Sequence, residues 1–533
     1  MNQGMLFDHL QNPQFYGPTV TSVKLIQTHI SYVALTGSYA YKIKKPVNFG
    51  FLDFSTLDKR HYYCEEELRL NKRLCPDMYL AVLPITQKDK TLELNGEGTI
   101  VEYAIQMKEF PQNCIMTNQL QKGSISEETI DRLCSILIDF YRSQHPSESV
   151  RSFGRLPAVK QNIDENFDQT KPMIDITVPK QLFFSIQNIV ERFFQEKKEV
   201  FDQRIQQERI YECHGDLHSG NIAIVNDKIY VFDCIEFNDR FRFCDAASDI
   251  GFLAMDLDFQ NYPYLSSYFI TKYIEKSKDR AIYSVLNFYK SYRAFVRGKV
   301  LGFQLNDPHI DLETKKTVLH TAKKYFELSE YYTKLFSLDL QKHPPFLFLV
   351  VGLSGTGKST VASKIAVDYH GVLINTDVVR KEIVGMDRYE RHHDPLNTGL
   401  YDPQKIDDTY EHVIQRAEKT LKKGYNVVLD ATFQKKKYRH LAYQLSERQH
   451  APIIIIQCVC PENVVKKRMD DRLQKKSVSD ARWEIYHVQK TTFEPFGPDE
   501  TSLLIDTSDD SYDYQMGFYR HLLSKALQTT EVF

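Results

Sequence analysis

The sequence lacks the features that would indicate a secreted, membrane-bound or nucleic-acid-binding protein. Its nine cysteines are scattered, and none of them has the C-x-x-C spacing of a zinc or redox site. No apolar run approaches the roughly 18 residues that a membrane-spanning helix needs, and the opening MNQGMLFDHLQNPQ has no apolar stretch of a signal peptide. A formal net charge of −2 gives no global attraction to nucleic acid. These absences favour a cytoplasmic protein with reduced thiols, no zinc, no membrane association and no nucleic-acid partner.

Length and composition indicate more than one domain. The chain has 533 residues, about three times the usual length of a domain, and its 42% hydrophobic and 26% charged residues are ordinary for a globular protein. In FSLDLQKHPPFLFLV a charged helical pattern stops before Pro344 and Pro345, and an apolar run begins. The predicted boundaries are 1–337 for the first domain, with a mostly-β small lobe at about 1–108 and a mostly-α large lobe at about 109–337, then 338–345 for a linker and 346–533 for the second domain.

The second domain alternates short apolar runs with helical segments. This order favours a parallel sheet covered by helices on both faces, the arrangement of an α/β protein. The expected strands are 346–351, 371–375, 426–430, 452–458 and 502–506.

A phosphate-binding loop follows the first of these strands. Residues 352–359, GLSGTGKS, match G-x-x-x-x-G-K-[ST] between an apolar strand and a helix, which is the context that the motif requires. Glycines let backbone N–H groups turn toward phosphate oxygens, and the helix N-terminus adds partial positive charge. Lys358 is expected to reach the β- and γ-phosphates and Ser359 to bind Mg²⁺. The residues expected to hold the nucleotide are Gly352, Ser354, Gly355, Thr356, Gly357, Lys358, Ser359 and Thr360.

Four more residues of the second domain have the chemistry of phosphoryl transfer. Asp430 ends a strand and suits an acid near Mg²⁺, while Asp377 ends another strand and suits the base for an acceptor hydroxyl. The alternative for Asp377 is an N-cap on the following helix. Arg468 and Arg472 share a helix face and are expected to stabilise the transferred group, although a solvated basic face is the alternative.

At these residues the second domain resembles the P-loop small-molecule kinases that include gluconate kinase, chloramphenicol phosphotransferase and zeta toxin. The matching segments are the loop at 352–359, TDVVRK at 376–381, LDATF at 429–433 and RMDDR at 468–472. The resemblance implies phosphoryl transfer from ATP. It does not identify the acceptor, because residues 383–410 match no member of the group.

The first domain carries a second constellation, in HGDLHSGN at 214–221. Asp216 and Asn221 have the D-x-x-x-x-N spacing of a kinase catalytic loop, and the strand KIYVFD then ends in Asp233. Asp216 is expected to act as the base, with Asn221 and Asp233 as Mg²⁺ ligands. The alternative is an Asp- and Asn-rich hairpin that binds nothing. His214 and His218 are expected to support the loop.

A kinase-like site also needs a lysine that orients ATP and a glutamate that holds it. Lys42 and Lys44 lie on one face of the strand in AYKIKK, and Lys42 is the preferred candidate. Glu67 is its expected partner on the following helix, for which Ser55 is the expected N-cap. The alternative is that these are surface charges.

The first domain resembles the aminoglycoside phosphotransferase and choline kinase family over roughly residues 30–335. The resemblance depends on HGDLHSGN, on VFD at 231–233 and on DAASDIGFLAMDL, in which Asp245 and Asp249 match structural acids. It implies an α+β bilobal kinase-like fold before the α/β P-loop fold. One departure is that the turn between the first strands has Gly37 but no G-x-G-x-x-G. The order of the two parts resembles bacterial proteins described as bifunctional aminoglycoside phosphotransferase/ATP-binding proteins.

These observations predict an ATP- and Mg²⁺-dependent phosphotransferase with two modules, each acting on a hydroxyl group of a small molecule. The alternative is a regulatory or toxin–antitoxin-like protein, in which one part senses ATP or restrains the other. The sequence leaves the acceptors and the oligomeric state open.

Overall fold

The secondary structure is taken from a computed structural model. It describes residues 3–89, 91–305, 310–338, 343–387, 402–473 and 483–530, with the single residues 307 and 399. The strands are β1 (Lys24–Gln27), β2 (Ser31–Leu35), β3 (Tyr39–Lys44), β4 (Tyr79–Lys88), β5 (Thr91–Leu94), β6 (Thr99–Lys108), β7 (Ile210–Glu212), β8 (Ile222–Val225), β9 (Lys228–Val231), β10 (Phe243–Asp245), β11 (Leu347–Val351), β12 (Val372–Asn375), β13 (Val427–Asp430), β14 (Ile453–Val459) and β15 (Ser502–Asp506).

Among the described residues, helices outnumber strands, and most of the helices follow the first six strands. The helices are α1 (Gln3–Leu10), α2 (Leu57–Asn71), α3 (Met116–Gln121), α4 (Glu127–Arg142), α5 (Glu148–Ser152), α6 (Leu156–Thr170), α7 (Lys180–Glu196), α8 (Lys198–Gln206), α9 (Asp239–Arg242), α10 (Ala246–Phe259), α11 (Pro263–Ser277), α12 (Tyr283–Gln304), α13 (Leu312–Leu338), α14 (Lys358–Asp368), α15 (Thr376–Ile383), α16 (Pro403–Leu421), α17 (Lys436–Gln449), α18 (Glu462–Leu473), α19 (Trp483–Thr492) and α20 (Tyr512–Thr530).

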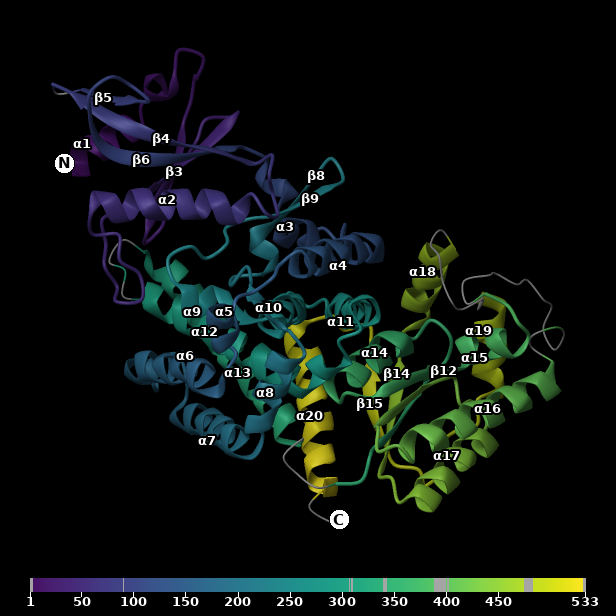
Figure 1. The fold of residues 1–533 in the computed structure, drawn as a ribbon. Coiled ribbons are helices and arrows are strands. Elements are labelled where there is room, and N and C mark those ends of the chain that lie inside the picture. Colours follow the sequence, from purple (N-terminus) through teal and green to yellow (C-terminus); the bar gives the residue numbers. More distant parts are fainter. Residues whose placement is uncertain are drawn as a thin grey trace. The chain divides into compact units, whose positions relative to one another are not determined.

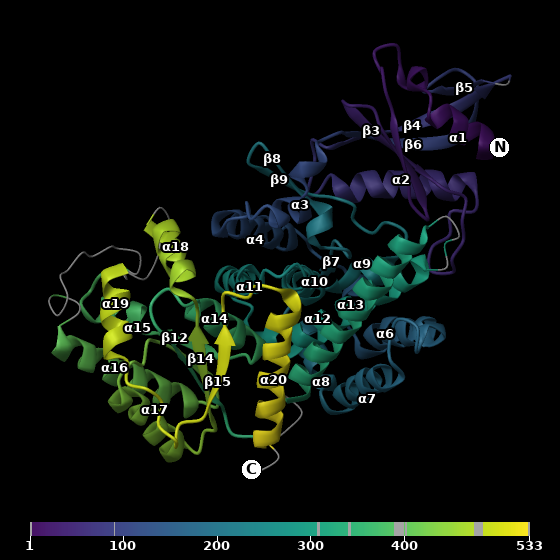
Figure 2. The same cartoon turned by 180° about the vertical axis from the view of Figure 1, so that it is seen from behind.

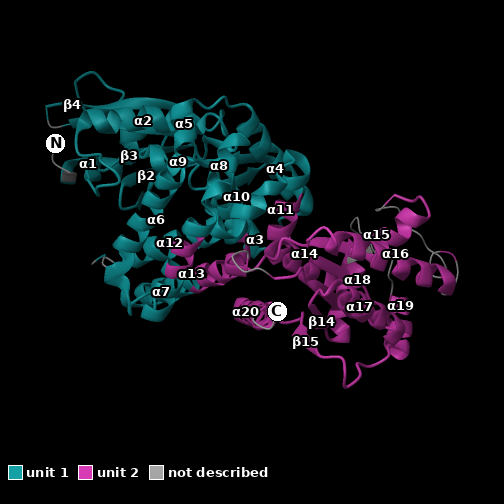
Figure 3. Cartoon of the chain, turned by 60° about the horizontal axis from the view of Figure 1, so that its bottom comes forward, with its two compact units in different colours: residues 1–187, 194–256, 272–326 teal, residues 188–193, 257–271, 327–533 magenta. Residues whose placement is uncertain are grey.

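The chain divides into two compact units, which Figure 3 colours separately. Unit 1 is made of residues 1–187, 194–256 and 272–326, and unit 2 of residues 188–193, 257–271 and 327–533. Three segments that precede the predicted linker therefore group with the C-terminal part. The linker itself lies partly outside the described residues, and the predicted domain boundaries stay a prediction.

Unit 1 contains a six-stranded antiparallel sheet in the order β1-β2-β3-β6-β4-β5. Helix α2 runs along one face of this sheet (Figure 1), where Cys64 packs with Tyr79 and Ile105. On the other face Leu6 and Leu10 of α1 join a separate apolar cluster. The two layers fix the positions of β3 and α2, the elements that carry Lys42 and Glu67.

Two details of this lobe differ from the predictions. The predicted strands around Gly37 are β2 and β3, but an earlier strand, β1, pairs with β2 through a turn at Thr28–Ser31. The predicted N-cap Ser55 is wrong, because Thr56 accepts the cap bond from the Lys59 N–H at 3.3 Å. Ser55 instead donates to Asp53. A hydroxyl side chain fits either position, so the sequence pattern misplaced the cap by one residue.

The remainder of unit 1 is mostly helical and contains two small antiparallel sheets, β7 with β10 and β8 with β9. The buried guanidinium of Arg204 forms ion pairs with Asp245 at 2.7 Å and Asp279 at 2.6 Å. Asp245 is the last residue of β10 and directly precedes α10. This pair therefore fixes the start of the helix whose acids hold the loop at 214–221.

Unit 2 contains a five-stranded parallel sheet in the order β12-β13-β11-β14-β15. The five strands predicted from the sequence are all present, with bounds that differ by one residue at most. Side chains of α16 and α17 form the apolar core on one face. On the other face Phe348 contacts Tyr369 at the end of α14, so helices cover both faces (Figure 2). The predicted fold class, a kinase-like α+β fold followed by a P-loop α/β fold, is confirmed.

A buried polar cluster joins α14, the helix that follows the phosphate-binding loop, to residues of α10 and α13. Lys364 forms an ion pair with Asp368 at 2.8 Å and lies 3.6 Å from Asp258. The hydroxyl groups of Tyr331 and Tyr332 donate to Asp368 and Asp258, each at 2.6 Å. Removing one partner of a buried ion pair typically costs about 3–5 kcal/mol. Helix α14, which follows the phosphate-binding loop, thus contacts residues that precede the predicted linker.

All nine cysteines are free thiols. Within the described residues, no helix is both long and apolar enough to cross a membrane.

Candidate active sites

The predicted lysine, glutamate and metal-binding aspartate meet in unit 1. The Lys42 Nζ lies 2.8 Å from Glu67 Oε1 and 2.6 Å from Asp233 Oδ1. Burial lowers the pKa of Lys42, but the carboxylates of Asp233 and Glu67 outweigh burial and hold this pKa well above its ordinary value. Glu67 is fully buried, which excludes the alternative that it is a surface charge. The structure thus brings the three residues together: the sequence predicted the contact of Lys42 with Glu67, and the fold adds the contact with Asp233.

Two further charges complete this network. Lys44, the second candidate from the sequence, donates to Glu67 Oε2 at 2.6 Å and also contacts Glu236. Burial raises the pKa of Glu67, yet Lys42 and Lys44 lower it to about 2. Glu236 was missed by sequence reasoning, because its partner is 192 residues away. Each carboxylate oxygen of Glu67 therefore accepts from one ammonium group, Oε1 from Lys42 and Oε2 from Lys44.

Asp216 and Asn221 also lie together. The Asn221 Nδ2 donates to the carbonyl and to Oδ2 of Asp216, at 3.0 Å each, and His218 Nε2 lies 3.4 Å from the same carboxylate oxygen. Burial raises the pKa of Asp216, but the nearby His218, Arg297 and His214 outweigh burial and lower it below its ordinary value. Asp216 is therefore an anion at neutral pH, as a proton acceptor must be.

The backbone of this loop is held by acids of α10. Asp249 accepts the N–H of His214 at 2.7 Å and of Gly215 at 2.9 Å, and Asp256 accepts the N–H of Ser219 at 2.8 Å. The His214 ring nitrogen Nε2 also bonds to the Phe232 carbonyl at 2.8 Å. Such contacts support the loop through its backbone, which agrees with the expected roles of Asp249 and His214.

The predicted metal ligands flank the β8–β9 hairpin: Asn221 directly precedes β8, and Asp233 follows β9. Asp233 has a backbone φ of +63°, a left-handed conformation that aspartate adopts more readily than most residues. The Phe232 N–H donates to the Asn221 carbonyl at 2.9 Å, which places Asn221 next to Asp233 in space. Because Asn221 uses its Nδ2 on Asp216, its Oδ1 is the atom left for a cation. An amide oxygen and a carboxylate fit the oxygen ligands that Mg²⁺ prefers.

Unit 1 has no glycine-rich turn in its sheet near Lys42, among residues that are all described. The turn at Thr28–Ser31 contains no glycine, and the N–H of Gly37 already donates to Glu109 Oε2 at 2.7 Å. Neither turn is a glycine-rich loop, so the binding of a triphosphate in this unit is expected to involve side chains such as Lys42.

The phosphate-binding loop of unit 2 has the backbone that its glycines allow. Gly355 and Gly357 have φ values of +81° and +80°, and a Cβ on Gly357 would lie 3.0 Å from the Thr507 hydroxyl. Gly352 likewise has a φ of +153°. Helix α14 begins at Lys358, directly after Gly357. The loop and the helix N-terminus therefore have the backbone arrangement that the predicted anion site requires, and phosphate binding there stays a prediction.

Ser359 and Asp430 are in direct contact at the ends of α14 and β13. The Ser359 hydroxyl donates to Asp430 Oδ2 at 2.8 Å, and Asn375 Nδ2 donates to the same oxygen at 2.6 Å. Burial raises the pKa of Asp430, and the Lys358 charge only partly offsets this effect. A hydroxyl held by a buried carboxylate is a donor set that suits Mg²⁺ beside a nucleotide. Asn375 was not identified from the sequence.

Asp377 follows β12 and forms an ion pair with Arg380 at 2.8 Å. The alternative reading of Asp377 as a helix N-cap is wrong. Asn375 is the N-cap of α15, and its Oδ1 accepts from the N–H groups of Asp377 and Val378. The Asp377 carboxylate is therefore not used as a cap, and its role as a base stays a prediction.

Of the two arginines predicted to stabilise the transferred group, the structure describes the side chain of Arg468. Arg468 donates to the Thr507 carbonyl at 2.6 Å and to its hydroxyl at 2.9 Å, and that hydroxyl donates to the Thr356 carbonyl at 2.7 Å. Arg468 thus reaches the phosphate-binding loop through Thr507. The side chain of Arg472 lies outside the described residues. The contribution of both to phosphoryl transfer stays a prediction.

Within the described part of the chain, no group of three or more His, Cys, Asp or Glu side chains could hold a metal ion by itself. Each candidate magnesium site instead combines one carboxylate with an amide or hydroxyl oxygen. Such a set leaves coordination positions for phosphate oxygens and water, which is the usual manner of Mg²⁺ binding with nucleotides.

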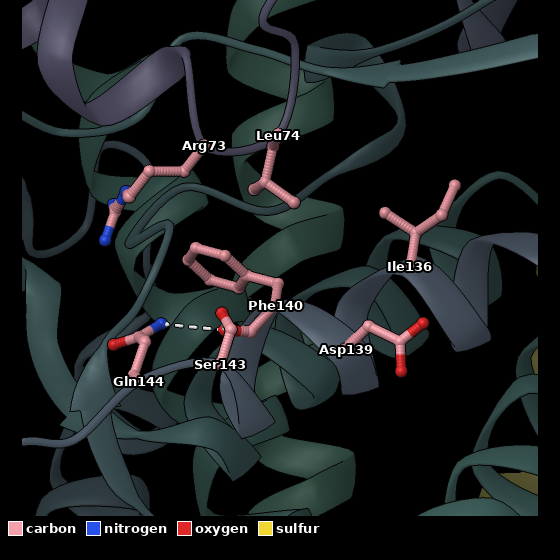
Figure 4. Close-up of a pocket in the computed structure, with 7 residues that line it drawn as sticks. All are labelled: Arg73, Leu74, Ile136, Asp139, Phe140, Ser143 and Gln144. Atoms are coloured by element: carbon pink, nitrogen blue, oxygen red, sulfur yellow. Dashed lines mark hydrogen bonds between the residues drawn. The ribbon is translucent and has the colours of Figure 1, made fainter.

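A separate pocket of about 480 Å³ lies between the end of α2 and α4 in unit 1 (Figure 4). The Arg73 guanidinium lies 4.9 Å from the Phe140 ring there, and the Gln144 side chain donates to the Phe140 carbonyl at 3.2 Å. Neither catalytic constellation contributes to the lining, which consists of Arg73, Leu74, Ile136, Asp139, Phe140, Ser143 and Gln144.

Comparison with known proteins finds a family match in the C-terminal part of the chain. The AAA domain family matches residues 347–496, which confirms the P-loop resemblance of the C-terminal part. An uncharacterized protein of Mycobacterium tuberculosis, Rv2004c, is 28% identical over 445 residues, which are 83% of this chain and 85% of that protein.

Solved structures similar to parts of the chain include two kinases. A choline/ethanolamine kinase family protein from Mesorhizobium loti has a TM-score of 0.36 and 11% identity, and covers 62% of this chain and 99% of its own. A sugar kinase from Janibacter sp. HTCC2649 has a TM-score of 0.26 and 19% identity, and covers 34% of this chain and 94% of its own.

Proposed function

We propose that the chain is an ATP- and Mg²⁺-dependent phosphotransferase with two nucleotide-binding modules. Each module transfers the γ-phosphoryl group of ATP to a hydroxyl group of a small molecule in the cytoplasm. The observation that carries the proposal is that one chain holds two separate groups of residues suited to a magnesium-bound triphosphate. In unit 1 they are Lys42 with Glu67 and Asp233, and in unit 2 they are the phosphate-binding loop with Ser359 and Asp430.

In unit 1, Lys42 orients the triphosphate, and Asn221 and Asp233 would hold Mg²⁺. The ion, when bound, neutralises charge on the phosphate oxygens. The acceptor hydroxyl gives its proton to Asp216 as its oxygen bonds to the γ-phosphorus. The bond from that phosphorus to the bridging oxygen breaks, and ADP leaves. The lowered pKa of Asp216 keeps the carboxylate ionised and ready to accept the proton.

In unit 2, the loop amides and Lys358 bind the phosphates, and Ser359 would hold Mg²⁺ with Asp430 behind it. Asp377 accepts the proton of the acceptor hydroxyl, and Arg468 stabilises charge on the transferred group. Support for this assignment comes from the AAA domain match and from the contact between Ser359 and Asp430. The sequence of residues 383–410 matches no P-loop kinase of known substrate, so the acceptor is left as a hydroxyl compound.

The test uses the full chain, because unit 2 includes residues 257–271 and 327–338 and a cut at the predicted linker would remove them. Purified protein is given γ-labelled ATP, Mg²⁺ and a metabolite extract, and label on small molecules is measured. Asp216→Asn is expected to lower transfer by one module by about 10²–10⁴-fold. Lys358→Ala is expected to abolish transfer by the other.

The exposed residue Asp202 on α8 provides a control, since Asp202→Asn removes a carboxylate away from both sites and is expected to leave transfer unchanged. The alternative function, a regulatory or toxin–antitoxin-like protein, predicts ATP binding without label on any small molecule. That result would overturn the proposal.

A further inference from the structure

Helix α12 places two arginines beside the catalytic loop of unit 1. Arg293 and Arg297 are four residues apart and therefore share one face of the helix. The Arg293 Nε donates to the Ser248 hydroxyl at 3.0 Å, and its guanidinium lies 5.0 Å from the Phe252 ring. Both contacts are with α10, the helix whose acids hold the loop at 214–221.

The same face of α12 reaches the predicted base. The Phe252 ring lies 5.5 Å from the ring of His218, and His218 Nε2 lies 3.4 Å from Asp216 Oδ2. Burial raises the pKa of Asp216, and the charges of His218 and Arg297 are the first of those that lower it below its ordinary value. Arg297, one turn along α12 from Arg293, thus lies within electrostatic reach of the base.

The two arginines differ in what they bind. The Arg297 Nε is buried and has no hydrogen-bond partner in the described part of the chain. The Tyr325 ring lies 5.7 Å from this guanidinium, but burial raises the pKa of that phenol to about 12, so it carries no charge at neutral pH. Asp256, whose charge also reaches Arg297, already accepts the Ser219 N–H at 2.8 Å. Since buried donors are nearly always hydrogen-bonded, an unpartnered one beside a catalytic group indicates a ligand.

Arg297 belongs to the acceptor side of the site. The nucleotide side has its own cation, Lys42, which pairs with Glu67 and Asp233. Arg297 instead lies near Asp216, the residue that takes the proton of the acceptor in the proposed function. It is partly exposed, so a molecule from solution can reach it. A guanidinium binds a carboxylate or a phosphate through two parallel N–H bonds, and it repels a cation.

We propose that the acceptor of unit 1 carries a carboxylate or phosphate group besides its hydroxyl, and that Arg297 binds this group and so presents the hydroxyl to Asp216. The inference rests on the proposed function of unit 1 and narrows its substrate class to anionic hydroxyl compounds. The transfer step is unchanged: the hydroxyl oxygen bonds to the γ-phosphorus, its proton passes to Asp216, and ADP leaves. Amines without an acidic group are expected to be poor acceptors.

The test determines which acceptors unit 1 uses. A metabolite extract is freed of nucleotides on charcoal and separated by anion exchange into a bound fraction, with carboxylates and phosphates, and an unbound fraction. Full-length Lys358→Ala, in which unit 2 is expected to be inactive, receives γ-labelled ATP, Mg²⁺ and each fraction. Label that disappears when Asp216→Asn is added to this variant is assigned to unit 1, and it is expected with the bound fraction. Prior phosphatase treatment of that fraction should abolish the label for a phosphate-bearing acceptor and preserve it for a carboxylate.

Variants of Arg297 then test its role. Arg297→Gln should raise the KM for the labelled acceptor by about 10–100-fold, the worth of a charge-assisted hydrogen bond, and leave the KM for ATP unchanged. Arg297→Lys should recover part of this loss, because it keeps the charge without the planar fork. Arg142→Gln is the matched control. This exposed arginine of α4 donates to the Lys276 carbonyl at 2.8 Å, and its loss should change neither KM.

Three outcomes would overturn the inference. Asp216-dependent label that appears only with the unbound fraction would do so and leave the proposed function intact, and this result does not depend on the stability of any Arg297 variant. A lower kcat in Arg297→Gln with an unchanged KM for the acceptor would mean that Arg297 acts only through the charge of Asp216. If no label depends on Asp216 with either fraction, the unit 1 part of the proposed function fails, and the inference fails with it.

Discussion

The two candidate sites are built in different ways. The site of unit 2 depends mainly on backbone N–H groups of one contiguous loop, which glycines shape and α14 continues. The site of unit 1 depends on side chains from β3, α2 and the segments after β7 and β9, which meet through ion pairs. A backbone site tolerates changes in the surrounding side chains. A site of buried charges requires that each charge keeps its partner.

The largest effect is expected from breaking the charge network of unit 1. Lys44→Met leaves the carboxylates of Glu67 and Glu236 buried without this ammonium, and should lower the free energy of unfolding by about 3–5 kcal/mol. The measurement is urea denaturation. Lys59→Met breaks an exposed pair with Asp53 in the same lobe and should cost less than about 1 kcal/mol. Equal losses in the two variants would contradict the buried network.

The corresponding change in unit 2 acts through one carboxylate. Asn375→Ser keeps a side-chain oxygen that can cap α15, but it removes the amide that donates to Asp430. This variant should weaken Mg²⁺ binding in the presence of ATP by about 10–100-fold. The measurement is the Mg²⁺ dependence of ATP affinity in a Lys42→Ala background. A loss of thermal stability with normal Mg²⁺ affinity would mean that Asn375 serves only as a cap.

Unit 1 also contains a buried lysine whose partners are neutral amides, in contrast to Lys42 and Lys44, whose partners are carboxylates. Lys299 bonds to Gln169 at 2.7 Å and contacts Asn166, and burial lowers its pKa from 10.5 to about 8. Between pH 8 and 10.5 the unfolded chain binds more protons at this residue, so stability should rise with pH by at most about 1.4 kcal/mol per unit. Lys299→Met should remove this rise when unfolding is measured at pH 8 and 9.5. An identical pH dependence in the variant would refute it.

The smallest effect concerns the helix that carries Glu67. Thr56→Ala removes the N-cap of α2 and should destabilise unit 1 by about 1 kcal/mol. Ser55→Ala should have little effect, because that hydroxyl only contacts the exposed Asp53. Differential scanning calorimetry compares the stabilities of the two variants. If Ser55→Ala were less stable than Thr56→Ala, Ser55 would be the N-cap, as the sequence pattern predicted.

The same contrast explains what could be predicted from the sequence. The loop of unit 2 and its strands follow from local patterns, since a Gly-Lys-Ser run after an apolar strand has few other uses. The spacing of Asp216 and Asn221 is likewise local. The partners of Asn375 and Glu236 are 55 and 192 residues away, and no periodicity links such positions. Their identification required the fold.

The most direct test of the central claim is the number of MgATP molecules bound per chain, measured by isothermal titration calorimetry. The account predicts two for the wild type, one for Lys358→Ala, one for Lys42→Ala and none for the double variant. A single site in the wild type, or loss of all binding in Lys358→Ala alone, would contradict it.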